Sequence, residues 1–425
     1  MLLNSQQSPR TTHPGRLFQF EICALCAFAF VLPLFEVPKN VLWIAYVLLW
    51  SLNRAKDRNF GGPWSAWDSL IVLWIVSAYA SAIFSGLHDS EWKSAFDVVR
   101  YAVVLWMVRR SDYSEDTLRK VLACVIFGTL AALLNGYYQL LFVPRADLQP
   151  RYLGLNSVGH VNHSAIYLAI AFGAALAWVR GAWRKDPPPR RALGLALCAA
   201  LVLSIFVMQS RATAGICLLI GFVLLAAYAF RSGKRLWKVM AGAFVIVLAL
   251  MVARPEVVEK NALRMKENNL LAFRDTIWRT GLEAWRQFPA FGVGMGNYGR
   301  ISLARLEEWS TQRGESFDRA RVMQQAHAHN LFVNSLAERG AFGLAMLIAV
   351  LGAWIVSLMR AIPTTSDSAT RWAYWGGALA AWIVAVLVGL VNTTLHHEHA
   401  LISMILLGGW LALSRRRPAG DPART

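Results

Sequence analysis

Apolar segments long enough to cross a bilayer recur along most of this chain, and they restrict its fold more than any other feature. Several reach the roughly 18–20 residues that a membrane-spanning helix requires. Of the 425 residues, 56% are hydrophobic and only 16% are charged, whereas soluble domains carry about 25% charged residues. The sequence therefore predicts an all-α, polytopic membrane protein.

Turn residues and charges between the apolar segments divide the chain into about twelve predicted spans. Nine lie in residues 1–253, a long polar loop occupies residues 254–330, and three lie in residues 331–425 together with a C-terminal tail. The predicted spans are residues 18–36, 40–53, 66–86, 95–108, 119–143, 163–180, 192–208, 213–230, 239–253, 341–359, 373–394 and 400–414.

Lysine and arginine are unevenly distributed between the two sets of alternating loops. One set is strongly basic, and the opposite set is sparse in these residues. Because cytoplasmic loops are enriched in lysine and arginine, we expect both termini in the cytoplasm and the loop 254–330 on the outer face. The basic segments are residues 54–58, 109–120, 180–191, 231–238 and 415–417.

The net charge of +18 does not indicate nucleic-acid binding. The basic residues lie mostly in short loops between apolar segments, as topology signals and contacts with anionic lipid do. A basic groove on a folded surface, which nucleic acid requires, is not predicted. The bilayer is the expected partner, with no nucleic acid. All five cysteines lie in apolar runs, so we expect buried thiols and no disulfide framework.

The loop 254–330 is the one long polar stretch, and it is rich in arginine. It holds twelve lysines and arginines against nine carboxylates. Long loops are translocated whatever their charge, so topology does not require this surplus of positive charge. We expect the surplus lysines and arginines to bind an anion. Within the loop, residues 270–288 predict an amphipathic helix that lies in the headgroup plane and ends before Pro289.

Residues 294–299 have the G-x-G-x-x-G spacing of dinucleotide-binding loops. Such loops follow a strand and open a helix, whereas this segment follows an amphipathic helix on the outer face. We therefore expect a tight glycine turn, in which the backbone approaches a neighbour or a phosphate, rather than a nucleotide site.

The polar loop ends at His327, His329 and Asn330. Asn330, Asn334 and Glu338 then recur at four-residue spacing, which predicts a polar stripe on a helix that enters the membrane. Such stripes face protein or a wet cavity rather than lipid, which would place His329 at the mouth of a cavity. A histidine with an ordinary pKa near 6.5 is suited to be a general base at neutral pH.

Two further groups of residues are candidates for function. Arg211 lies where one predicted span ends and the next begins; an unpaired arginine there is costly, so it is a functional candidate, the alternative being snorkelling to the interface. The histidines of 396–399 and 327–329 could be metal ligands, although zinc sites on helices favour donors at i and i+4. Polar lining of an outer cavity is the favoured interpretation of both histidine groups.

These motifs together resemble the bacterial O-antigen ligase family. The segment 329–343, with its His-Asn start and glycines at 340 and 343, is similar to the histidine motif of the family. The segments around Arg211 and Arg274 resemble two further motifs, and residues 159–165 match a fourth more loosely. O-antigen polymerases and protein O-oligosaccharyltransferases share much of this pattern.

The resemblance implies a fold similar to the C-type membrane glycosyltransferases, with a helical periplasmic subdomain. It implies transfer of O-antigen polysaccharide from undecaprenyl diphosphate to the lipid A-core, at the periplasmic face of the bacterial inner membrane. It also implies no cofactor and no metal. A single displacement would invert the anomeric centre.

The resemblance assigns roles to individual residues. His329 is the expected base for the acceptor hydroxyl. Arg211 and Arg274 are expected to bind the donor diphosphate, since guanidinium groups grip phosphate oxygens in pairs and can stand in for Mg²⁺. The secondary candidates are Asn330, His327, Asn162, His163, Arg151 and Tyr298.

Other functions share parts of this pattern. A polymerase would use another lipid-linked repeat as acceptor, and a protein O-oligosaccharyltransferase would use a protein. A lipid or solute transporter is a non-enzymatic alternative. Transporters tend to carry ionisable groups near mid-membrane and to be built from repeated halves, and the sequence shows no internal repeat.

Overall fold

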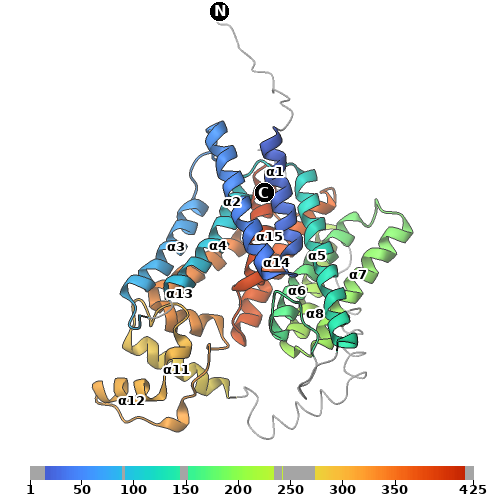
Figure 1. The fold of residues 1–425 in the computed structure, drawn as a ribbon. Coiled ribbons are helices and arrows are strands. Elements are labelled where there is room, and N and C mark those ends of the chain that lie inside the picture. The colour runs from blue at the N-terminus through green and yellow to red at the C-terminus, as the bar shows by residue number, and fades with distance from the viewer. Residues whose placement is uncertain (1–14, 89–90, 144–151, 234–241, 243–272, 417–425) are drawn as a thin grey trace, which may run out of the picture.

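The computed structural model describes residues 15–88, 91–143, 152–233, 242 and 273–416, and every regular element in these ranges is a helix. Figure 1 shows long helices side by side in a bundle, with two shorter helices, α11 and α12, at one end. Seven of the described helices have the length and hydropathy needed to cross a membrane. The predicted all-α, multi-pass membrane fold is therefore confirmed.

Eleven of the described helices lie at the positions of predicted spans. The predicted span 239–253 lies outside the described residues, apart from residue 242, so the total of twelve and the division at 254 and 330 stay predictions. The eleven helices are α1 (Arg16–Val31), α2 (Glu36–Asp57), α3 (Ala66–Phe84), α4 (Glu91–Arg110), α5 (Glu115–Phe142), α6 (Val161–Ala182), α7 (Pro188–Val207), α8 (Arg211–Arg231), α13 (Leu331–Met359), α14 (Ala369–Leu387) and α15 (His397–Arg415).

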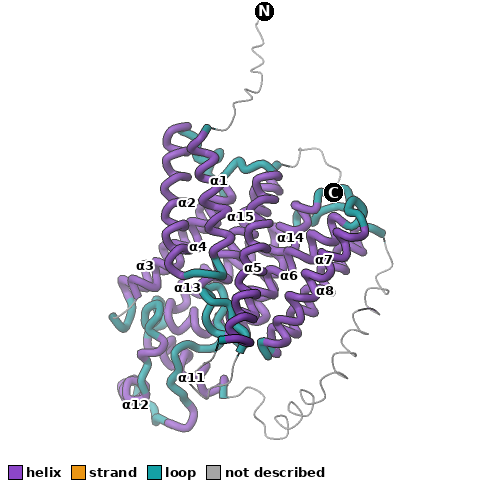
Figure 2. Tube along the Cα trace, turned by 45° about the vertical axis from the view of Figure 1, so that its right-hand side comes forward, coloured by secondary structure: helices purple, strands orange, loops and turns teal. Residues whose placement is uncertain are grey.

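Helices α6 and α14 form the centre of the bundle, where they lie side by side (Figure 2). Small residues allow the close approach: a Cβ atom on Gly173 would stand 2.2 Å from the Cβ of Ala380, and one on Gly376 would stand 2.3 Å from that of Ala177. Small residues at such contacts are typical of helix packing in membranes, where dispersion forces replace the hydrophobic drive. The pair fixes the start of α6 next to the loop that follows α14.

Buried ion pairs tie together the basic loops at the end of the bundle opposite α11 and α12. Arg109 and Arg110 both reach Asp68, at 2.7 and 2.8 Å, and Arg54 pairs with Glu21. Arg416, just after α15, donates to Tyr113 O between α4 and α5, so the end of α15 lies at this same end of the bundle. The described parts of the basic segments 54–58, 109–120 and 415–417 therefore share one end, while the side of the membrane that they face stays a prediction.

The described part of the long polar loop contains α11 (Arg274–Gln287), the 3₁₀ turns η1 (Tyr298–Arg300) and η2 (Arg319–Arg321), and α12 (Leu303–Gln312). The predicted amphipathic helix is present from Arg274 onward and ends at Gln287, two residues before Pro289; residues 270–272 lie outside the described part. Its buried face packs on α13. This face of the helix therefore contacts protein, and a position of the helix in the headgroup plane stays a prediction.

Helix α13 is broken at Gly340, where φ is 63° and ψ is −166°. The break frees the carbonyl oxygens of residues 337–338, which accept hydrogen bonds of 2.9 and 3.0 Å from the N–H groups of residues 293–294. Beyond the break, the N–H groups of residues 341–342 donate to the carbonyl oxygens of residues 289–290. The loop after α11 is therefore docked on α13 by backbone hydrogen bonds.

The same docking explains the glycine-rich segment 294–299. Gly294 and Gly296 have φ angles of 97° and 77°, which side chains with a Cβ rarely adopt. The turn lies against α13. Tyr298, in the same segment, donates a hydrogen bond from its hydroxyl to Ile277 O. The expected tight glycine turn is confirmed, and the neighbour that its backbone approaches is the broken helix.

Replacing Gly340 with alanine is expected to destabilise the fold by about 1–3 kcal/mol or more. A Cβ there would lie 2.3 Å from the carbonyl carbon of Ala290, and the positive φ is strained for alanine. Gly352→Ala is the matched control, because it lies in the same helix with no atom within 4 Å of the added carbon. Thermal unfolding of the two detergent-purified variants tests this; equal midpoints would contradict it.

Candidate active site

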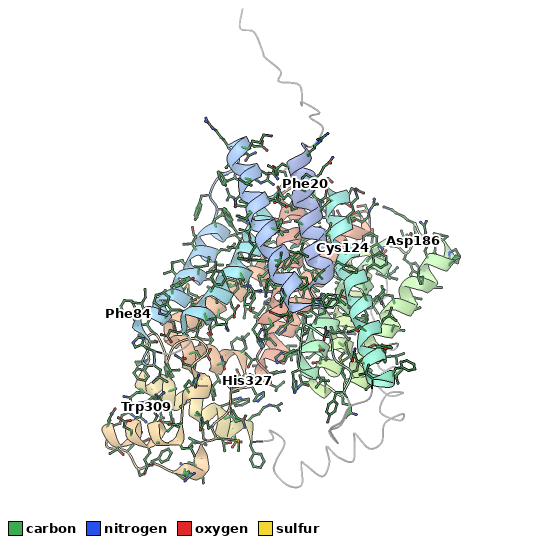
Figure 3. All side chains as sticks on the ribbon, viewed as in Figure 1. Phe20, Phe84, Cys124, Asp186, Trp309 and His327 are labelled. Atoms are coloured by element: carbon green, nitrogen blue, oxygen red, sulfur yellow. The ribbon has the colours of Figure 1, made fainter. Side chains whose placement is uncertain are left out.

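Seven histidines from three distant segments converge at the end of the bundle next to α11. The ring of His163, in the first turn of α6, lies 4.6 Å from that of His396 and 5.5 Å from that of His399, centre to centre. His327 and His329 form a second pair with ring centres 4.1 Å apart, within electrostatic range of His163. Figure 3 shows His327 between the long helices and the α11–α12 region. The remaining members are His160 and His397.

A chain of hydrogen bonds holds the backbone of residues 327–329 in place. Ala328 N donates to Asn334 Oδ1 at 3.0 Å, and Asn334 Nδ2 donates to Glu338 Oε2 at 2.9 Å. The other oxygen of Glu338 accepts from Tyr298 N. The predicted polar stripe on α13 therefore faces protein, where it anchors the histidine loop. His329 itself has a φ of 49°, in the left-handed region.

Asn330 has a structural role in this arrangement. Its side-chain oxygen accepts hydrogen bonds from Phe332 N and Val333 N, at 2.9 and 3.0 Å, so it caps the start of α13. Its amide nitrogen donates to Leu390 O at 3.0 Å. Asn330 thus joins the histidine loop to the segment that follows α14.

Arg274 lies close to His329. It is the first residue of α11 and is half-buried, and its positive charge acts on the His329 ring. Two of the three predicted catalytic residues, separated by 55 positions in the sequence, therefore lie within electrostatic range of each other. The packing of α11 on α13 produces this proximity.

Arg211 is the first residue of α8, and only its backbone is described. Helix α8 contacts the 3₁₀ turn η3 (Val388–Leu390), which accepts the hydrogen bond from Asn330. The backbone of Arg211 is thus placed at the histidine end of the bundle, and the reach of its guanidinium toward Arg274 stays a prediction. Arg151 lies outside the described residues.

Burial lowers the pKa of His329 to about 4, and the charges of His327 and Arg274 act in the same direction. A hydrogen bond with the Asn392 side chain opposes this shift. Burial also lowers the pKa of His327. At neutral pH the His329 ring is therefore uncharged and able to accept a proton. Asn392 is a site residue that the sequence did not reveal, since it lies in an unpatterned turn after α14.

The low pKa predicts an unusual pH profile. In the free protein, kcat/KM for the transfer catalysed at this site should keep its full value well below pH 6.5 and fall only as His329 becomes protonated, near pH 4. The sign follows because only the neutral ring of the predicted base can accept a proton. Initial rates between about pH 4 and 8 test this, with unfolding followed in parallel as a control. An acid limb centred near pH 6.5 in stable protein would contradict the prediction.

His163, His396 and His399 bring one nitrogen each within 4.8 Å of one another, a grouping that could hold a metal ion. Two of these rings are already engaged as a reciprocal cap of α15, in which each ring accepts the other residue's backbone N–H. His396 Nε2 also lies 3.0 Å from Thr393 O. The His396 ring is thus held by backbone groups, whereas His163 Nδ1 and His399 Nδ1 are buried without a hydrogen-bond partner in the described structure. These contacts favour capping of α15 as the role of His396 and His399, with the free nitrogens lining the site.

A buried ion pair lies next to the histidine cluster. Lys39 of α2 pairs with Glu398, the residue between His397 and His399, and Ser157 donates to Glu398 at 3.0 Å. The pair joins α2, the loop before α6 and the start of α15. Sequence reasoning missed it, because its members are 359 residues apart.

The remaining predicted residues divide into two groups. Asn162 and His163 lie in the first turn of α6, within the histidine cluster, and Asn162 N donates to His160 Nδ1 at 3.2 Å. Tyr298 is buried between α11 and α13, where its ring packs against Gly281. It supports the fold of the outer region rather than contacting the histidines.

Comparison with known proteins gives two matches. Residues 198–348, which include Arg211, Arg274 and His329, match the family model described as O-antigen ligase. The chain is also 26% identical to the exopolysaccharide production protein ExoQ of Rhizobium meliloti (strain 1021). That alignment covers 96% of this chain and 94% of the relative.

Proposed function

We propose, from the now confirmed resemblance of this chain to the O-antigen ligase family, that it transfers O-antigen polysaccharide from undecaprenyl diphosphate to the lipid A-core. The reaction would take place at the periplasmic face of the bacterial inner membrane, with both termini in the cytoplasm. The single observation that supports this most is that Arg274 lies within electrostatic range of an uncharged, half-buried His329.

The proposed reaction is a single displacement at the anomeric carbon. The acceptor hydroxyl gives its proton to the His329 ring as its oxygen forms the new bond to the anomeric carbon. The bond from that carbon to the diphosphate oxygen breaks, and undecaprenyl diphosphate leaves with the electron pair. Arg274, together with Arg211, would stabilise the negative charge of the leaving group. The configuration at the anomeric carbon inverts.

Binding of the donor would also prepare the base. In the free protein, the charge of Arg274 contributes to the low pKa of His329. A bound diphosphate would neutralise that charge and raise the pKa of His329, because a nearby anion favours the protonated imidazolium. His329 would therefore become a stronger base only when the donor is present, which couples proton removal to productive binding.

A second candidate acceptor has an observation in its favour. The relative ExoQ is described as an exopolysaccharide production protein, which suits a polymerase in which another lipid-linked repeat accepts the glycan. The donor, the base and the diphosphate contacts would be the same in both reactions. The choice between ligase and polymerase therefore concerns the acceptor alone.

One reconstitution separates these functions. Purified protein is supplied with lipid-linked polysaccharide, rough lipopolysaccharide, or both, in the presence and absence of chelator. A product ladder that requires both substrates and survives chelator supports the ligase. Extension of the lipid-linked glycan without lipopolysaccharide supports the polymerase. Translocation of the lipid-linked glycan across vesicles, with no new glycosidic bond, would replace both with a transporter.

A further inference from the structure

A cavity of about 670 Å³ lies beside the histidine cluster. It is bounded by the last turns of α5, the segment before α6, the first turn of α6 and the turn between α7 and α8. Its volume is within the roughly 300–1,000 Å³ typical of sites for small ligands. Neither the proposed base nor the proposed diphosphate arginines line it, so the reaction described above does not account for it.

Among the described residues, the lining of this cavity is polar and includes no carboxylate, lysine or arginine. Five of the lining residues are amides, and each amide side chain offers both hydrogen-bond donors and acceptors. Only Asn156 uses its amide within the described part of the protein, where it donates to Leu34 O. The other four are Asn135, Gln139, Asn162 and Gln209.

Hydroxyl groups have the same dual character, so this lining is complementary to a polyhydroxylated ligand. Tyr152 adds an aromatic surface with a polar tip. A carboxylate or phosphate inside the cavity would find no lysine or arginine on the described wall to offset its loss of hydration. The cavity therefore fits a neutral sugar better than an anionic one.

The cavity lies next to residues of the proposed donor site. His160 lines the cavity, its ring lies 6.0 Å from that of His163, and it is within electrostatic range of His329. On the other wall, Gln209 precedes Arg211 by two residues. The cavity thus adjoins both the proposed base and the backbone of one proposed diphosphate residue.

We propose that this cavity binds the uncharged sugar at the diphosphate end of the donor glycan, held by the amides of Asn135 and Gln139. The inference rests on the proposed function, since it presupposes a lipid-diphosphate-linked donor. It adds a substrate class: donors whose first sugar is neutral should be preferred over donors whose first sugar is a uronic acid.

Binding to the protein in lipid nanodiscs tests the proposal with three probes: undecaprenyl diphosphate, undecaprenyl diphosphate-glucose and undecaprenyl diphosphate-glucuronic acid. The wild type should bind the glucose probe more tightly than the other two. Asn135→Leu and Gln139→Leu, singly and combined, should weaken binding of the glucose probe, by about tenfold for the pair, and leave undecaprenyl diphosphate unaffected. Gln19→Leu, at an exposed position on α1, should change nothing.

The outcomes separate this inference from the proposed function. Wild-type affinities in the leucine variants, in protein with an unchanged unfolding midpoint, would overturn the inference alone. Equal binding of the glucose and glucuronic acid probes, or a loss confined to the lipopolysaccharide acceptor, would also overturn it. If the wild type binds none of the three probes, the proposed function fails and the cavity proposal falls with it.

Discussion

Replacing His329 with asparagine is expected to lower the rate of glycan transfer by about 10²–10⁴-fold, the usual contribution of a positioned base. The ring is half-buried and uncharged at neutral pH, and no other residue is assigned the acceptor proton. Asparagine keeps the fold, because it tolerates the left-handed backbone that His329 adopts, with φ at 49°. Alanine should abolish transfer as well, with some loss of stability from that backbone.

Single-turnover transfer with saturating donor and acceptor is the measurement, since it reports chemistry rather than product release. His88→Asn is the control, because His88 is exposed and lies outside the histidine cluster. Donor binding should be unchanged in His329→Asn, and its unfolding midpoint should stay close to that of the wild type. A correctly folded His329→Asn protein with full activity would remove the base from the mechanism.

The residues that could be predicted from the sequence are those with a local pattern. The spacing of His329, Asn330 and Gly340 lies within a dozen residues and reflects one loop, one cap and one helix break. Arg274 could be found because it opens a helix with an apolar face. Each of these features lies within a short stretch of sequence, and the structure places each of them near the end of the bundle that carries the histidine cluster.

The residues that could not be predicted depend on contacts between distant segments. Lys39 and Glu398 have no sequence pattern in common, and their pairing exists only because α2 lies beside the start of α15. The meeting of His163 with His396 likewise follows from the packing of α6 on α14. The polar stripe of α13 is a third example. Periodicity identified the face of the helix that carries Asn334 and Glu338, but it could not show that these side chains accept hydrogen bonds from backbone N–H groups.

Replacing Arg274 with lysine is expected to lower kcat by about 10²–10³-fold, the cost of removing one donor from a site that stabilises developing negative charge. Lysine keeps the positive charge but loses the planar fork that binds two phosphate oxygens at once. Arg211→Lys should behave similarly, and both should weaken binding of undecaprenyl diphosphate. Arg279→Lys is the matched control, because Arg279 is an exposed arginine on the same helix. Unchanged donor affinity in both lysine variants would separate these arginines from the diphosphate.

A charge-removing variant tests the geometry independently of the rate. Arg274 contributes to the low pKa of His329, so Arg274→Gln should raise that pKa and move the acid limb of kcat/KM to higher pH. Arg274→Lys retains the charge and should leave the limb near its wild-type position. If Arg274 bound the donor but lay far from His329, both variants would have lower affinity for the donor, and the acid limb of kcat/KM would stay in place in both. The combination of a shifted limb in Arg274→Gln and weakened donor binding in Arg274→Lys therefore requires that one guanidinium lie beside both the base and the departing diphosphate.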